Sequence, residues 1–158
     1  MNIEKRNQLL SIALGIVILV LGYILYHSIV DPYQKVIERQ EMRERVRHQM
    51  SNVRDALMQY KRNNDEFPPS EGGLDSLVQF LKTDSLMIAQ GDSLFRPMPP
   101  DVYNPDSLIH SPRPPHKKFE YVLNDTLRPE IYVLRDPDTE DRIGDLEKTT
   151  LLNAPSWK

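Results

Sequence analysis

The chain contains no cysteine. A disulfide framework and a zinc site built from thiolates are therefore both excluded. The four histidines are isolated in the sequence and do not form a ligand cluster. No transition-metal centre is predicted from these two residue types.

Glycine is also scarce, with 6 residues in the chain. The sequence has no phosphate-binding glycine loop, no G-x-S-x-G and no H-E-x-x-H motif, and Gly72-Gly73 lacks the residues that such a loop needs around it. A Ser/His/Asp set would need loose residues such as His110, which nothing in the sequence places beside a serine. The sequence therefore predicts that the protein is not an enzyme.

Positive charge is not in excess either. Lys and Arg number 20 against 23 Asp and Glu, for a net charge of -3, and the two signs are interleaved. A nucleic-acid partner, which needs a basic face, is not expected.

One long hydrophobic run is present, from Leu9 to Val30, and it contains no Asp, Glu, Lys or Arg. At about 1.5 Å per residue it reaches roughly 33 Å as a helix, which is enough to cross a bilayer core of about 30 Å. A buried core helix would need more protein around it than the rest of the chain provides, and no small-x-small cleavage site follows the run. We expect a tail at 1–8, a transmembrane helix at 9–30 and a domain at 31–158.

The orientation of this span is indicated by the basic residues on its two sides. Two basic residues, Lys5 and Arg6, precede the run. Five follow it closely: Lys35, Arg39, Arg43, Arg45 and Arg47. By the positive-inside rule, this count places the large domain in the cytoplasm.

After the span, Asp31 and Pro32 offer an N-cap and a first residue for a new helix almost where the first one ends, so the transmembrane helix is expected to continue into a long amphipathic helix. Apolar residues then recur at helical spacing: Met42, Val46, Met50, Val53, Leu57 and Tyr60. The pattern predicts an amphipathic helix that ends near Asn63-Asn64, before two prolines. Three roles are compatible with the apolar stripe: covering the protein's own core, pairing as a coiled coil, or contacting other subunits of a larger assembly. Its spacing does not discriminate among them.

The remainder predicts mixed structure. Ser70 is expected to cap a second helix, and Asp84-Ser85 to begin a further turn or two. The buried face of the second helix is expected to carry Leu74, Leu77, Val78 and Leu81. Between Gly91 and Pro115, seven prolines disfavour regular structure. The segments 119–125 and 130–136 alternate as half-buried strands and predict an antiparallel hairpin.

The segment from Ala56 to Leu81, ALMQYKRNNDEFPPSEGGLDSLVQFL, resembles the turn between the first two helices of the major pseudopilin of type II secretion systems. Both have a helix ending in Tyr, a turn with Asn, an aromatic-Pro pair and a Glu/Gly step into a Leu-rich helix. Phe67, Pro68, Pro69 and Gly72 are expected to have packing roles, and Gly72-Gly73 is expected to let the second helix start close to the first. The resemblance implies a pilin-like α+β fold, with the domain periplasmic and the span in a bacterial inner membrane.

The prepilin peptidase signature of that family is absent. Its members carry a basic leader ending in Gly and a Glu inside the apolar run, whereas the nearest acid here is Glu4, outside the run. A fixed membrane-anchored component with a pseudopilin fold is therefore expected.

Acidic residues gather after the second predicted strand, in LRDPDTEDRIGDLE. Calcium takes about six to eight oxygen ligands, and the spacing is not that of an EF-hand. The pseudopilin family places calcium in the corresponding loop, which Ile143-Gly144-Asp145 resembles. The expected ligands are the carbonyl of Leu134 and the carboxylates of Asp136, Asp138, Asp141 and Asp145. The alternative is a solvated acidic turn in which Pro137 and Gly144 set the bends.

The first interpretation is thus a structural component of a type II secretion or type IV pilus-like machine. Its expected partners are the membrane, other assembly components and further copies of itself. The second interpretation is a membrane-tethered periplasmic adaptor or stator that binds a partner through the helix from Tyr33 to Arg62.

Overall fold

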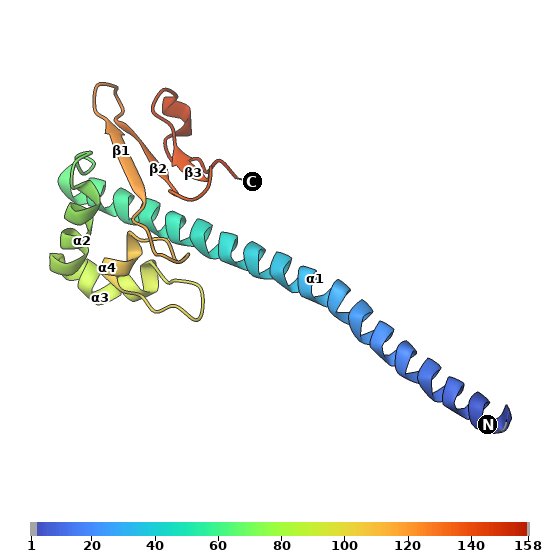
Figure 1. The fold of residues 1–158 in the computed structure, drawn as a ribbon. Coiled ribbons are helices and arrows are strands. Elements are labelled where there is room, and N and C mark those ends of the chain that lie inside the picture. Colours follow the sequence, from blue (N-terminus) through green and yellow to red (C-terminus); the bar gives the residue numbers. More distant parts are fainter. Residues whose placement is uncertain (1–2, 158) are drawn as a thin grey trace. The chain divides into compact units, whose positions relative to one another are not determined.

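The computed structural model describes residues 3–157, apart from the side chain of Asp31 (Figure 1). Its helices are α1 (Ile3–Asn64), α2 (Gly73–Thr83), α3 (Ser85–Leu94) and α4 (Pro105–Leu108). Its strands are β1 (Glu120–Asn124), β2 (Ile131–Arg135) and β3 (Arg142–Gly144), followed by a 3-10 turn at Thr149–Leu151. The chain divides into a unit that ends at Glu41 and a unit that begins at Met42. The predicted α+β class is confirmed.

The first unit is the N-terminal part of α1, which is long and apolar enough to cross a membrane. Its most apolar window has no buried residue, and Leu19 is 75% exposed. An apolar surface of this kind is typical of a helix that faces lipid, and it does not suit a core helix. Of the predicted tail 1–8, residues 3–8 already belong to α1, while residues 1 and 2 lie outside the described part of the chain.

The expected continuation of the apolar span into a long amphipathic helix is confirmed, because α1 includes both. The expected helix start at Asp31-Pro32 is wrong, because α1 continues through Pro32. Proline has no N–H to donate to the carbonyl of Ser28, but its fixed φ is helical. The helix therefore loses one backbone hydrogen bond and is not terminated.

In the second unit, the predicted apolar stripe of α1 is the centre of the core. Val46, Met50, Val53 and Leu57 are all fully buried, and they belong to one hydrophobic cluster with residues of α2, α3 and the sheet. Tyr60 packs at the edge of this cluster. The spacing left three roles open for the stripe: the protein's own core, a coiled coil or a larger assembly. The central part of the stripe belongs to the protein's own core. The helix ends at Asn64, as predicted.

Helix α2 buries the predicted face, but Ser70 does not cap it. The N-cap is Gly72, at a φ of 67°. The Ser70 hydroxyl instead accepts a hydrogen bond from the Leu123 N–H (2.9 Å) and donates one to the Leu123 carbonyl (3.2 Å). The Ser70 hydroxyl therefore pairs with the main-chain N–H and carbonyl of Leu123 on β1. Because it is engaged there, it does not cap α2.

Asp84 begins α3 as expected, since its Oδ1 accepts hydrogen bonds from two N–H groups of the first turn. The helix is 10 residues long, which exceeds the turn or two predicted. Within the proline-rich stretch, Asn104 caps α4, a single turn that the sequence did not predict. The Gln49 side chain on α1 donates to the carbonyls of Ser107 and Leu108, both at 3.1 Å, and so attaches α4 to the long helix.

The predicted hairpin is confirmed as β1 and β2, and β3 joins β2 as a third antiparallel strand. Tyr121, Leu134 and Ile143 lie opposite one another across the sheet and are buried. At its outer edge, the Gly144 N–H of β3 donates to the carbonyl of Ala154. The turn between β2 and β3 lies at one end of this short three-stranded sheet.

Candidate functional site

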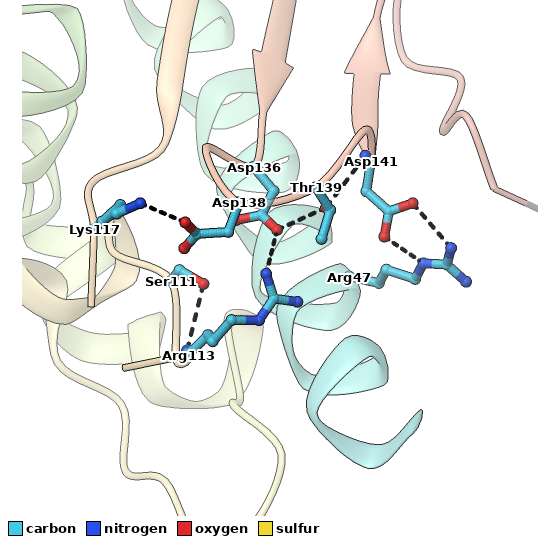
Figure 2. A network of polar contacts seen from close by, with 8 residues as sticks. All are labelled: Arg47, Ser111, Arg113, Lys117, Asp136, Asp138, Thr139 and Asp141. Atoms are coloured by element: carbon cyan, nitrogen blue, oxygen red, sulfur yellow. Dashed lines mark hydrogen bonds and ion pairs between the residues drawn. The ribbon is translucent and has the colours of Figure 1, made fainter. Parts of the chain in front are cut away.

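The β2–β3 turn, residues 136–141, carries three of the carboxylates predicted to bind calcium. Its ends are joined by a hydrogen bond from the Asp136 N–H to the Asp141 carbonyl (3.0 Å). Figure 2 shows that Asp136, Asp138 and Asp141 each meet a basic side chain from another part of the second unit. The turn is an acidic cluster surrounded by its own counter-charges.

Asp136 is the most buried of the three, with a side chain that is 0% exposed. Its Oδ2 accepts hydrogen bonds from Arg113 Nη1 (3.0 Å) and from Thr139 Oγ1 (2.7 Å). Its Oδ1 has no hydrogen-bond partner among residues 3–157. A buried carboxylate depends on its partners for stability, so Arg113 and Thr139 determine whether this charge can stay inside the protein.

Asp138 and Asp141 lie nearer to solvent. Asp138 pairs with Lys117, whose side chain is half exposed. Asp141 makes a two-point contact with the Arg47 guanidinium: Nε donates to Oδ2 at 2.8 Å and Nη2 donates to Oδ1 at 2.9 Å. The hydrogen bond from Arg47 to Asp141 raises the pKa of Arg47 above its ordinary value, against the opposing effect of desolvation. The guanidinium also lies over the Trp157 ring, 5.2 Å from its centroid.

The two other predicted ligands have different surroundings. Leu134 lies inside β2 and pairs with Tyr121 on one side and Ile143 on the other. Asp145 follows β3, and its Oδ1 accepts hydrogen bonds from the N–H groups of Glu147 (2.8 Å) and Lys148 (3.0 Å). These main-chain hydrogen bonds lower the pKa of Asp145. Asp145 thus forms a local turn of its own, separate from the 136–141 turn.

The donor set fits a calcium ion only in part. Asp136 Oδ2 and both oxygens of Asp141 face N–H or O–H donors, which leaves Asp136 Oδ1 as the one unengaged oxygen of these two carboxylates. Across the described part of the chain, no group of three or more His, Cys, Asp or Glu side chains is arranged to hold a metal ion. Calcium binding stays a prediction, and a calcium ion in this turn would have to displace basic side chains.

Sequence reasoning missed the three basic residues that meet this turn, Arg47, Arg113 and Lys117. Arg47 and Asp141 are 94 positions apart, and the other two pairs are more than 20 apart. Local spacing contains no signal for such contacts, which only the folded chain creates.

A pocket of about 490 Å³ lies beside α4 and is lined in part by His110 and His116. His110 Nδ1 donates to the Asp106 carbonyl (2.9 Å) and His116 Nδ1 donates to the Ser111 carbonyl (3.0 Å). A ring nitrogen that faces a carbonyl oxygen carries the proton, so these contacts set the tautomer of both rings. His110 therefore makes a main-chain contact where a catalytic triad would need a carboxylate.

Comparisons of the chain with family models, with curated proteins and with solved structures give no match.

Proposed function

We propose that this protein is a structural component of a type II secretion or type IV pilus-like machine, anchored in a bacterial inner membrane by a single span. The observation that carries the proposal is α1, a single helix that contains both the apolar run and the apolar stripe of the domain core. A helix that is lipid-compatible at one end and core-forming at the other suits a protein whose domain is attached permanently to a membrane.

The segment that resembles a pseudopilin turn supports this role by its packing. Phe67 is 3% exposed, and its ring centroid lies 5.0 Å from that of Tyr132 on β2. The Lys61 ammonium lies 4.2 Å from the Phe67 ring centroid, and the Tyr121 hydroxyl donates to the Pro68 carbonyl at 2.9 Å. These contacts join the end of α1 to the sheet, which supports the packing role expected of Phe67 and Pro68.

Gly73 completes this junction in a way that differs slightly from the prediction. A Cβ at Gly73 would lie 3.1 Å from the Tyr121 ring and 3.3 Å from the Pro68 Cβ. The glycine therefore lets α2 begin close to β1 and the proline turn, where the sequence suggested a close approach to α1. A larger residue at this position would push the helix away from the sheet.

We propose a periplasmic position for the second unit, against the charge count around the span. A reporter enzyme that is active only in the periplasm, fused after Lys158, is expected to be active in bacterial cells. The same fusion with a reporter active only in the cytoplasm should be silent. Activity of the cytoplasmic reporter alone would contradict the proposal and favour the orientation that the positive-inside rule predicts.

The second candidate function is a membrane-tethered adaptor or stator, and the segment of α1 just after the span favours it. Tyr33 is 67% exposed and Val36 is 48% exposed, so this part of the helix presents apolar side chains that the chain itself leaves uncovered. Because residues 46–57 are used in the core, a partner helix would have to bind before them.

Crosslinking separates the two candidates, because the natural chain has no cysteine. Val36→Cys in the full chain should form a disulfide-linked dimer of two copies if the protein assembles with itself through this face. Glu38→Cys, two residues on and so about 200° further around the helix, is the matched control and should not form the dimer. A single adduct with a different membrane protein, and no dimer, would favour the adaptor.

A further inference from the structure

The β2–β3 turn concentrates negative charge in a way that requires compensation. Four carboxylates occur within six residues, at Asp136, Asp138, Glu140 and Asp141. Their mutual repulsion opposes the tight turn that the hydrogen bond between its two ends creates. In calcium-binding loops, the metal ion removes this repulsion.

In this chain, one basic side chain pairs with each of the three aspartates of the turn. Arg113 and Lys117 come from a single loop, and the Ser111 N–H closes that loop by donating to the Lys117 carbonyl at 2.8 Å. The third base, Arg47, comes from the rigid second half of α1. The three basic side chains therefore come from segments outside the acidic turn, and those segments hold them in position.

Burial shows which of the three contacts matters most. The Asp136 side chain is fully enclosed, whereas the Arg113 side chain remains 24% exposed. A mobile cation from solvent would have to displace Arg113 to reach Asp136 Oδ2, and would leave Arg113 without its carboxylate. Such an exchange costs free energy, because Arg113 loses its charge-assisted hydrogen bond inside the protein.

We propose that Arg47, Arg113 and Lys117 together act as a built-in substitute for a divalent cation, so that the β2–β3 turn closes and stays ordered without calcium. This inference does not depend on the proposed secretion role. It assigns a function to three residues for which the pseudopilin resemblance provides none, and it makes the acidic turn a fixed joint between α1, the 111–117 loop and the sheet.

The test uses the full chain in detergent micelles, with the fluorescence of Trp157, the only tryptophan, as the reporter beside Arg47. The unfolding temperature is expected to be the same in chelator and in millimolar calcium. Arg113→Met should lower it by roughly 5 °C or more, because a buried charge then lacks its partner. Arg128→Met, which removes a largely exposed arginine next to the same sheet, is the matched control and should leave it unchanged.

The double variant Arg113→Met with Asp136→Asn removes both charges. It should recover much of the loss, since the cost comes from the unpaired carboxylate and not from the missing methylene contacts. It also keeps the test decisive if Arg113→Met alone fails to fold. Three results would overturn the proposal: unfolding that moves to higher temperature with calcium in the unaltered chain, an Arg113→Met chain as stable as the control, or a double variant no more stable than the single one.

Discussion

Arg47 and Asp141, 94 positions apart, form a two-point ion pair that joins the long helix α1 to the start of β3. The planar guanidinium matches the carboxylate with two parallel hydrogen bonds, a geometry that lysine cannot reproduce. Both side chains are partly exposed, at 27% and 14%, so solvent screens part of their attraction.

A double-mutant cycle at this pair should show a coupling free energy of about 1 kcal/mol, larger than for a fully exposed pair. Arg47→Met and Asp141→Asn, singly and together, would be measured by chemical unfolding. The pair Arg54 and Asp55, adjacent on the helix surface, is the control and should couple more weakly. Equal coupling in the two pairs would show that the two-point geometry has no energetic consequence.

Leu57→Ala should destabilise the second unit by about 2 to 5 kcal/mol, because the side chain is fully buried in the core. A fragment of residues 31–158, which is expected to fold without the span, is suitable for this measurement by thermal or urea unfolding. Leu86→Ala, at a side chain 57% exposed, should change stability by less than about 0.5 kcal/mol. If Leu57→Ala unfolded like the unaltered fragment, the stripe of α1 would serve a partner and not this core.

Gly144→Ala should be more damaging than Gly72→Ala, although both glycines have positive φ, at 85° and 67°. A Cβ at Gly144 would lie 2.1 Å from the Tyr132 main-chain oxygen, whereas nothing lies within 4 Å of one at Gly72. Backbone strain alone costs about 1 to 3 kcal/mol, and the clash adds to it only at Gly144. Unfolding midpoints of the two variants, compared side by side, check this. Similar losses would mean that the sheet adjusts to the extra carbon.

Stability should fall at alkaline pH through Tyr121 and Tyr132. Burial raises the pKa of both phenols well above the ordinary value of about 10. The unfolded chain therefore releases these protons first, and the stabilisation that is fully present below about pH 10 is lost as the pH rises further. Each tyrosine contributes up to about 1.4 kcal/mol per pH unit in that range.

Urea unfolding of the 31–158 fragment from pH 8 to 11.5 would measure this slope. Tyr132→Phe should make it shallower, and tyrosinate absorbance should show two phenols that ionise only with unfolding. If all tyrosines ionised together near pH 10 in the folded fragment, the burial of these hydroxyls would not control their titration.

Features that depend on neighbours in the sequence were predictable. The apolar run, the stripe from Val46 to Leu57 and the hairpin of β1 and β2 all follow from side-chain periodicity, which sets the buried face of an element wherever that element lies. The end of α1 at Asn64 follows from the prolines after it. The three-residue strand β3 was missed, because so short a segment has no periodicity to read.

Only the acidic residues of the candidate site could be predicted from the sequence. Its carboxylates are neighbours in the chain and were found, whereas their counter-charges come from segments that only folding brings together. For the same reason Ser70 bonds to β1 where its local context predicted a helix cap. Local sequence determined the apolar run and the stripe of α1, the buried face of α2, the hairpin and the acidic turn. The tertiary structure alone decided that this turn meets Arg47, Arg113 and Lys117, because an ion pair depends on distance in space and not on distance along the chain.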